Sequence, residues 1–356
     1  MTSELSSLCS YAKGKVSVDT LSKRNYVSTE NMMPNKGGIV DAGALPSAQY
    51  TQQYIKDDIL VSNIRPYFKK IWMADDDGGC SNDVLVFRAD RGCDSTFLYY
   101  ILANDAFFNY ASATSKGTKM PRGDKTAIMQ YKVPCFNYET QLRIGKLLRS
   151  IDDRIAVNKK INDNLQQQAQ AIYSSMFIDN PDPAWSHGHL SDLITVKYGK
   201  DHKKLADGIY PVYGSGGIMR YVERPLYNKE SVLIPRKGTL NNVMYVNQPF
   251  WSVDTMFYTE MKLPNVAKFV YHFVKAKDLA SMNAGSAVPS MTTDILNAME
   301  VVIPSASALE EFESLVAPMY EAMEANDVQS KALSQMRDTL LPKLMSGEID
   351  VSDIQL

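Results

Sequence analysis

The sequence lacks the motifs of the common nucleotide-dependent enzymes. It contains no GxxxxGK[ST] phosphate loop, no complete GxGxxG turn opening a βαβ unit and no Asn-Pro-Pro-aromatic motif of amino-methyltransferases. The Gly-rich stretch from Tyr213 to Gly217 is expected to be only a turn. These absences argue against a nucleotide-dependent enzyme, and we expect the chain to bind no cofactor.

Cysteine is scarce, and long apolar runs are absent. The four cysteines all lie in the first half and form no CxxC pair, so we expect reduced thiols and no metal site. His187-Gly-His189 has no counterpart elsewhere, which favours a surface or capping role. No window approaches 18 consecutive apolar residues, and the N-terminus lacks a signal-peptide pattern. These absences lead us to expect a cytoplasmic protein that makes no contact with membranes.

An overall excess of basic charge is also missing, since the formal net charge is −2. Residues 306–356 carry 3 Lys/Arg against 10 Asp/Glu, however, and hide a mildly basic remainder. Residues 116–132 hold five Lys/Arg and one acid, and residues 197–237 hold nine and four. Phosphate binding depends on such local fields, although a randomly clustered solvated surface would give the same counts.

The sequence does contain an internal repeat with a period of about 170 residues. Gly14-Lys15 recurs as Gly199-Lys200, and Tyr131-Lys-Val-Pro134 recurs as Val301-Val-Ile-Pro304. Two further pairs are Phe97-Leu-Tyr99 with Phe269-Val-Tyr271, and Gly117-Thr-Lys-Met-Pro121 with Gly285-Ser-Ala-Val-Pro289. A long helical pattern follows each copy. The repeat predicts two similar modules related by an approximate two-fold axis, suited to contacting two similar targets.

Each helical pattern has the 3- and 4-residue spacings of a coiled-coil seam. The first seam runs through Leu148, Ile151, Ile155, Asn158, Asn162, Leu165, Ala169, Ile172 and Met176. The second runs through Val316, Met319, Met323, Asn326, Ser330, Leu333, Arg337, Leu340 and Leu344. Both have polar residues near the middle, so we expect antiparallel helices in which Asn158 and Asn162 lie near Ser330 and Asn326. Solvent exposure of these positions is the alternative.

Pro318 has no partner in the first helical pattern. It predicts the start of a new helix after a short lead-in from Ala308. The remaining sequence predicts α+β modules with short strands and two long polar loops, 22–53 and 198–221. We divide the chain into a first module (1–140), a first spacer helix (141–180), a second module (181–305), and a second spacer helix with a tail (306–356).

Binding residues are expected where glycine, hydroxyl groups and cations recur at the same place in both copies, because backbone amides and cations there can approach phosphate. In the first copy these candidates are Lys15, Arg65, Lys69, Lys116, Gly117, Thr118, Lys119 and Arg122. In the second copy they are Lys200, Lys203, Ser215, Arg236, Lys237, Thr239, Asn283, Ser286 and Ser290. Ordinary Gly/Pro loops remain the alternative for either copy alone.

Taken together, these motifs resemble the specificity subunits of Type I restriction-modification systems. The paired Gly-hydroxyl-x-x-Pro motifs carry the resemblance, with Gln141-Leu-Arg-Ile-Gly145 opening the first helix and Leu340-Leu-Pro-Lys-Leu-Met-Ser-Gly-Glu-Ile349 near the end. Such subunits have two target-recognition domains joined by two long antiparallel spacer helices. The resemblance implies a non-catalytic protein that reads a bipartite site in double-stranded DNA.

The resemblance also implies partners. Specificity subunits dock two methyltransferase subunits, which use S-adenosylmethionine, and restriction/translocase subunits join the full complex. A recognition subunit of a methylation-only or Type II-like system is the alternative. An enzyme for a small polar ligand would show one asymmetric set of His, Asp or Cys residues, and a structural coiled-coil adaptor would not need two large basic modules.

Overall fold

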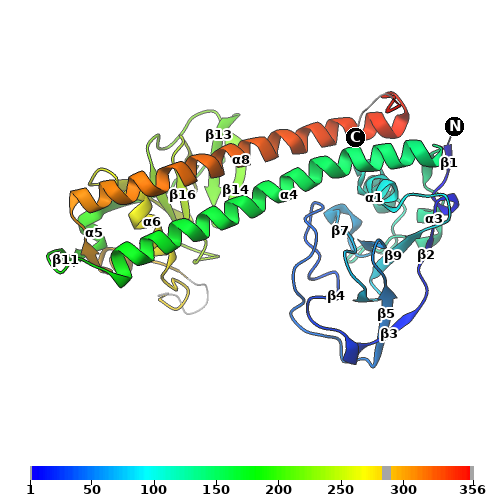
Figure 1. Ribbon diagram of the computed structural model, residues 1–356, viewed down its shortest axis with the longest axis horizontal. Coiled ribbons are helices and arrows are strands. Elements are labelled where there is room, and N and C mark those ends of the chain that lie inside the picture. The colour runs from blue at the N-terminus through cyan, green and yellow to red at the C-terminus, as the bar shows by residue number, and fades with distance from the viewer. Residues whose placement is uncertain (1, 283–289, 353–356) are drawn as a thin grey trace. The chain divides into compact units, whose positions relative to one another are not determined.

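The computed structural model describes residues 2–282 and 290–352. The chain forms two compact units. Unit 1 combines Met1–Asn158 with Asp327–Leu356, and unit 2 is Lys159–Asn326. Each unit contains one mixed module of strands and short helices together with a segment of both long helices (Figure 1). The predicted α+β class is confirmed.

The main sheet of unit 1 has the strand order β2-β9-β6-β7 with antiparallel neighbours. Its strands are β2 (Cys9–Tyr11), β9 (Val84–Ala89), β6 (Ile59–Ser62) and β7 (Ile71–Met73). Helices α1 (Ser95–Ala103) and α2 (Asp105–Ala113) share its buried core, and α1 also packs on the first long helix (Figure 1). The two helices are separated at Asn104, whose side chain caps α2.

A second sheet of unit 1, ordered β3-β5-β8-β4, flanks the first. Its strands are β3 (Lys15–Ser17), β5 (Tyr50–Tyr54), β8 (Gly78–Cys80) and β4 (Tyr26–Val27). The predicted loop 22–53 is largely irregular, although it includes β4 and the start of β5. The unit is completed by β1 (Thr2–Glu4), β10 (Lys132–Pro134), helix α3 (Lys125–Met129) and 3₁₀ turns at Leu5–Ser7, Val18–Thr20 and Pro66–Phe68.

Unit 2 repeats this arrangement. Its main sheet has the order β12-β18-β15-β16, which corresponds strand for strand to the main sheet of unit 1. Its strands are β12 (Ile194–Tyr198), β18 (Met256–Met261), β15 (Ser231–Pro235) and β16 (Met244–Val246). Helix α6 (Ala267–Lys275) takes the place of α1, and α7 (Thr293–Asn297) that of α3. Strands β11 (Ser186–His189) and β19 (Glu300–Ile303) pair as β1 and β10 do, and α5 (Leu190–Leu193) follows β11.

The prediction of a loop over 198–221 is wrong. The segment contains β13 (Asp207–Gly214) and most of β14 (Gly217–Val222), which form a hairpin that pairs with β17 (Trp251–Ser252). Pro211 within β13 argues against a regular strand. The ladder accommodates it with irregularities between Asp207 and Tyr210 and between Val212 and Tyr213. The Gly-rich stretch forms the turn of this hairpin, as expected.

Helices α4 (Tyr138–Ser174) and α8 (Ala306–Ser346) contribute to both units, and a π-helical turn, Ser175–Asp179, follows α4. Their seam positions are buried or half-buried, and none of them is exposed. Leu148 and Leu344 are fully buried in unit 1, and Ala169 and Val316 are fully buried in unit 2. In unit 1, Asp152 contacts Arg337 and Asn158 contacts Ser330. In unit 2, Asn162 contacts Asn326 and Tyr173 contacts Phe312. Because the contacts run in opposite order along the two helices, the segments are antiparallel in each unit.

Polar residues of the two seams meet as predicted. In unit 1, the Asn158 amide donates hydrogen bonds to Gln329 Oε1 (2.8 Å) and Ser330 Oγ (3.2 Å). In unit 2, the Asn326 amide donates to Asn162 Oδ1 (2.8 Å), and the Asn162 amide donates to the Met323 carbonyl (3.1 Å). A polar pair in an otherwise apolar seam disfavours shifted registers, because a shift would leave these groups unpaired.

The predicted break at Pro318 is wrong, because α8 is continuous from Ala306 to Ser346. Pro318 lies on the exposed face of the helix, where a carbonyl that loses its helical donor can bind water. Phe312, Val316 and Tyr320 are buried on the opposite face and hold the helix on either side of the proline.

The modules contact the helices at equivalent positions of the repeat. In unit 1, Tyr100 of α1 donates a hydrogen bond to Asp152 of α4 (2.6 Å), and Arg337 pairs with the same carboxylate (2.6 Å). In unit 2, His272 of α6 contacts Tyr320 of α8, with 3.0 Å between Nε2 and the hydroxyl. The residue types differ, but in each unit a polar contact fixes the module on its helices. Among the described residues, no helix is both long and apolar enough to span a membrane.

Candidate nucleic-acid interface

The same two loops are joined in both units. In unit 1, the loop after β6 forms a β-bridge with the loop before α3, between Ile64 and Arg122. The backbone N–H of Gly123 donates to the Asn63 carbonyl (3.1 Å), and that of Arg65 donates to the Pro121 carbonyl (2.8 Å). These bonds place Arg65 beside the predicted Gly-hydroxyl-x-x-Pro loop.

In unit 2, the loop after β15 makes the equivalent pairing. Lys237 forms a β-bridge with Ser290, and the Met291 N–H donates to the Arg236 carbonyl (2.9 Å). The candidates Arg236, Lys237 and Ser290 are therefore brought together. Asn283 and Ser286 lie outside the described residues, so their predicted roles remain predictions.

The loop of residues 116–122 in unit 1 is a narrow, exposed projection. Its ends are closed by reciprocal backbone hydrogen bonds between Lys116 and Arg122 (2.8 and 2.9 Å). Gly117 has φ +94°, a conformation that favours glycine, which explains why glycine opens the motif. Thr118 and Lys119 are exposed at the tip. The loop therefore presents a hydroxyl and an ammonium group to solvent.

Ion pairs orient the cations at the base of this loop. Lys116 Nζ lies 2.5 Å from Asp124, and Arg122 lies 3.0 Å from Asp83. The Lys116 ammonium, followed by the backbone N–H of Ala127, lowers the pKa of Asp124. Asp124 also caps α3 through the N–H groups of Thr126 and Ala127. One carboxylate thus links the loop to a helix and keeps Lys116 near the projection.

Arg65 and Lys69 delimit the neighbouring 3₁₀ turn of unit 1. Both have left-handed backbone conformations, with φ of +51° and +52°. The Lys69 ammonium and that of Lys36 contact the two carboxylate oxygens of Asp105 at 2.8 and 2.9 Å. Arg65 Nε is buried and has no hydrogen-bond partner among the residues that the structure describes.

The basic loop of unit 2 is built against an aromatic ring. The Arg236 guanidinium lies 5.3 Å from the centre of the exposed Tyr198 ring and donates to the Asp254 carbonyl (3.2 Å). Gly238, at φ +87°, passes so close to Ser215 that a Cβ would lie 2.7 Å from its Oγ. Ser215 is thereby brought next to the loop that carries Lys237 and Thr239, both of which are exposed.

Lys200 and Lys203 lie on the segment after β12. The Lys200 N–H donates to the Ser252 carbonyl (2.8 Å), and its own carbonyl accepts from the Trp251 indole (2.8 Å). A Cβ on Gly199 would lie 2.0 Å from the Val253 carbonyl oxygen, so this close approach requires glycine. Both lysines are exposed, and the backbone of Lys200 is fixed at β17.

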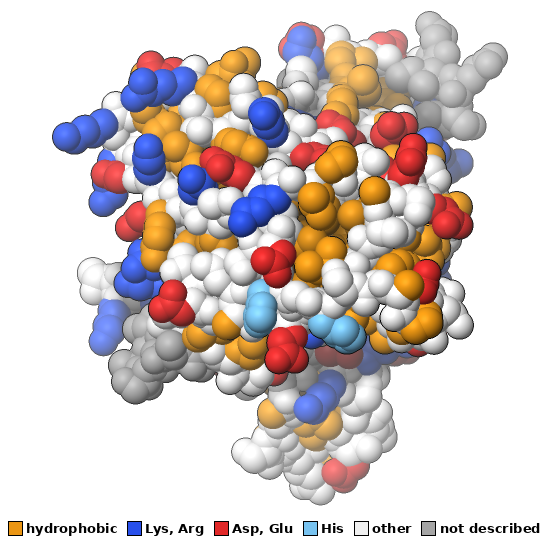
Figure 2. All heavy atoms as spheres, turned by 90° about the vertical axis from the view of Figure 1, so that its left-hand side faces the viewer, with side chains coloured by type: hydrophobic (Ala, Val, Ile, Leu, Met, Phe, Trp, Pro, Cys, Tyr) orange, Lys and Arg blue, Asp and Glu red, His pale blue; other side chains and the backbone are white. Residues whose placement is uncertain are grey.

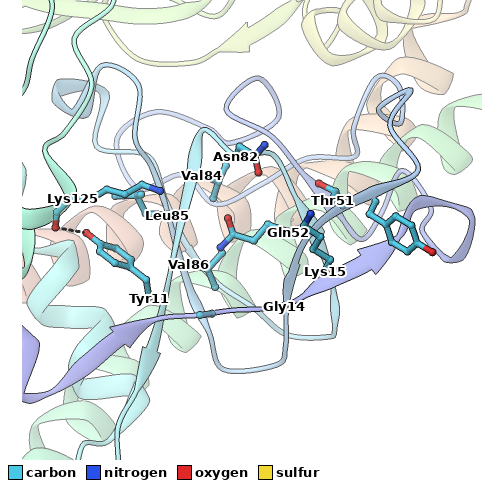
Figure 3. Close-up of a pocket in the computed structure, with 12 residues that line it drawn as sticks. Tyr11, Gly14, Lys15, Thr51, Gln52, Asn82, Val84, Leu85, Val86 and Lys125 are labelled. Carbon is cyan, nitrogen blue, oxygen red and sulfur yellow. Dashed lines mark hydrogen bonds between the residues drawn. The ribbon is translucent and has the colours of Figure 1, made fainter.

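Lys15 lines a cleft of unit 1 with a volume of about 330 Å³ (Figure 3). The amides of Gln52 and Asn82 also line it, with Tyr11 and Lys125 on the far side. The Tyr11 hydroxyl donates to the Lys125 carbonyl (3.0 Å), and the Lys125 ammonium lies 5.9 Å from the Tyr11 ring centre. The cleft combines cations with groups that both donate and accept hydrogen bonds.

Outside these loops, the surface carries charges of both signs. The face in Figure 2 shows acidic and basic side chains interspersed, with Lys and Arg more frequent toward its left edge. The described residues contain no cluster of three His, Cys, Asp or Glu side chains able to hold a metal ion. The grouped cations, hydroxyls and amides are suited to binding phosphate and base edges.

Sequence reasoning missed several residues of these surfaces. Gln52, Asn82 and Lys125 are joined only by the fold, since they come from strand β5, the turn between β8 and β9, and the start of α3. Tyr198 directly precedes Gly199-Lys200, and an aromatic residue beside a repeated cation was a signal available in the sequence. Tyr67 and Phe68, between Arg65 and Lys69, were adjacent to predicted residues and were overlooked.

Comparison with known proteins identifies related sequences across most of the chain. A family model described as the Type I restriction modification DNA specificity domain matches residues 1–167 and 184–312. The two matches cover both modules, as expected from the internal repeat.

Individual relatives are specificity subunits of Type I restriction systems. The Type I restriction enzyme MjaIX specificity subunit of Methanocaldococcus jannaschii is 24% identical over 307 residues, covering 74% of this chain and 71% of the relative. The HindI specificity subunit of Haemophilus influenzae is 21% identical, covering 91% and 94%. The crystal structure of a Type I restriction-modification S subunit from M. genitalium has a similar fold, with a TM-score of 0.62 and 19% identity over 97% of this chain and 96% of that one.

Proposed function

The chain belongs to the Type I restriction-modification DNA specificity family, and we propose that it reads a bipartite site in double-stranded DNA, one half-site per module. The observation that carries this proposal is the recurrent pairing of Ile64 with Arg122 and of Lys237 with Ser290. In both units it places cations on fixed backbone at the end of a central strand of the main sheet. None of the relatives above supports the methylation-only or Type II-like alternative.

Within each module, exposed cations would bind phosphate and set the orientation on the duplex, whereas amides, hydroxyls and rings would contact bases. Lys119 and Lys237 are suited to the first role because their side chains are exposed and have no ion pair among the described residues. We infer that the chain itself is non-catalytic and acts on DNA in the cytoplasm through its partners. The chemistry of its candidate residues is that of binding rather than of bond cleavage.

The long helices would set the gap between the half-sites. We assign residues 1–140 and 181–305 to the two recognition domains, and residues 141–180 and 306–356 to the spacer segments. Helix α4 has 37 residues, or roughly 55 Å at 1.5 Å per residue. Adjacent major-groove sites on one face of DNA recur every ~34–36 Å, so a rod of this length suits two half-sites.

Two methyltransferase subunits would bind the outward faces of the helices, with restriction/translocase subunits joining through the complex. Apolar side chains are exposed there at Val157 and Ile161 on α4 and at Val328 and Met336 on α8. Residues 306–356 carry 10 acidic against 3 basic residues, so this surface favours a protein partner over DNA.

Coexpression with the cognate methyltransferase tests this assignment. We expect the two proteins to copurify with two methyltransferase chains per specificity chain, and sequence-specific methylation to require both. A methyltransferase that modifies the same sites equally well alone would contradict the proposal. A chain that never copurifies with the methyltransferase would contradict it as well.

A further inference from the structure

An exposed pair of aromatic rings stands at the 3₁₀ turn of unit 1. Tyr67 is 52% exposed and Phe68 is 39% exposed. Their ring centres are 4.7 Å apart and their planes are inclined by 56°, so the rings pack on each other. They form a blunt apolar projection, the Tyr67–Phe68 knob, whereas Phe87, Phe97, Phe107 and Phe108 of this unit are buried in its core.

The backbone around the knob is held in an unusual conformation. Arg65 and Lys69, at its two ends, have left-handed φ values, and so do Asn35 (+55°) and Lys36 (+63°) in an adjoining loop. The two loops are joined, because the Asn35 N–H donates to the Phe68 carbonyl and the Lys36 N–H to the Lys69 carbonyl, both at 2.8 Å. Non-glycine residues persist in this conformation only where surrounding contacts fix them, and such positions concentrate at binding sites.

Further contacts fix the knob from two other sides. The Arg65 N–H donates to the Pro121 carbonyl of the 116–122 loop (2.8 Å), and the Phe68 N–H donates to the Arg65 carbonyl (3.0 Å). The ammonium groups of Lys36 and Lys69 both form ion pairs with Asp105 at the start of α2. The rings are therefore presented on a rigid base, so little conformational freedom would be lost when they bind a partner.

The surroundings of the knob carry positive charge. Segments 63–70 and 116–122 together contain six Lys/Arg and no Asp/Glu. Arg65, Lys70 and Lys119 have no ion pair among the described residues. An apolar projection surrounded by cations is complementary to a groove of duplex DNA, where phosphates flank the base edges.

We propose that the Tyr67–Phe68 knob makes apolar contacts with base edges in the major groove of the half-site bound by unit 1. This inference rests on the proposed function and names residues that read bases within it. Apart from the Tyr67 hydroxyl, the rings have no group that binds phosphate, whereas they can pack against groups such as the thymine methyl. The equivalent loop of unit 2 carries Lys237-Gly238-Thr239 and no aromatic residue, so the two modules read DNA by different chemistry.

The test uses the full chain assembled with its methyltransferase subunits. Tyr67→Ala and Phe68→Ala are compared with the unsubstituted chain on DNA libraries in which each half-site is randomised in turn. We expect roughly tenfold lower discrimination at one or two adjacent base pairs of one half-site, which is within the range of a single mismatch. The other half-site and the salt dependence of binding should be unchanged, because no phosphate contact is removed.

Two controls make the test specific. Tyr138→Ala removes an aromatic side chain of unit 1 that is 51% exposed but lies outside the knob, and it should leave both half-site preferences unchanged. Tyr67→Phe keeps the ring and should retain the preference. If an alanine variant does not assemble with the methyltransferase, Phe68→Gln, which keeps the bulk of the side chain but removes the apolar ring, takes its place.

Unchanged preferences in both knob variants would overturn the inference, and so would equal relaxation at both half-sites. The proposed function fails by a different result, namely an unsubstituted complex that binds or methylates DNA without any sequence preference.

Discussion

Acidification should destabilise unit 2 through one buried histidine. His272 is fully buried, with Nδ1 2.8 Å from Gln170 Oε1 and Nε2 3.0 Å from the Tyr320 hydroxyl. An amide oxygen only accepts hydrogen bonds, so Nδ1 carries the proton and Nε2 accepts from Tyr320. Both nitrogens of the neutral ring are therefore satisfied, and a second proton would place a charge in the core.

The size of the effect follows from the pKa. Burial, followed by the nearby charge of Lys275, lowers the pKa of His272 from 6.5 to about 4. In the unfolded chain this group takes up a proton near pH 6.5, so below that pH the unfolded state binds more protons than the folded state. The contribution of the neutral His272 ring to the free energy of unfolding is fully present above pH 6.5 and is lost as the pH falls toward 4. Between pH 8 and pH 5 the loss amounts to about 2 kcal/mol.

Urea unfolding at the two pH values measures this loss. Trp72→Phe leaves Trp185 and Trp251, both in unit 2, as fluorescence reporters. In that background, His272→Gln should lower the free energy of unfolding at pH 8. On acidification from pH 8 to pH 5, the free energy of unfolding of this variant should fall by about 2 kcal/mol less than that of the protein with His272. If both proteins lose the same free energy on acidification, the reasoning about His272 is refuted.

Three further predictions concern DNA. Changing Lys119 and Arg122 together to Ala should weaken binding of one half-site and reduce the slope of affinity against salt, as titrations at several salt concentrations would show; equal loss at both half-sites would contradict separate modules. A four-residue insertion after Lys160, matched by one after Val328, should lengthen both helices by about 6 Å and the gap by one or two base pairs, as read from methylated sites. The isolated chain should bind DNA weakly in mobility-shift assays because its net charge is −2.

Local spacing made the helices and the repeated loops predictable. The heptad spacing from Leu148 to Ala169 predicts which side chains of the first long helix face its core, and the residues at both ends of this stretch are buried. The pairing of Asn162 with Asn326 follows because the repeat and the heptad impose the same register. The loops after β6 and β15 could be matched because each follows an apolar strand at the same place in the repeat.

Other features depend on long-range contacts that the sequence does not display. A proline normally interrupts a helix because it lacks a backbone N–H. At Pro318, packing of the buried face of α8 outweighs the loss of that helical hydrogen bond. The hairpin of β13 and β14 was hidden by Pro211 and by the glycines of its turn. The Tyr67–Phe68 knob is exposed because flanking residues adopt left-handed conformations, and neither Arg65 nor Lys69 is a residue type that signals them.

The central claim is that two modules on one chain read two separate half-sites. Sequencing of methylated bases in DNA from cells that express this chain with its cognate methyltransferase tests it most directly. We predict one bipartite motif, with two specified halves separated by an unspecified gap of constant length. A single uninterrupted motif, or methylation that does not depend on this chain, would contradict the claim.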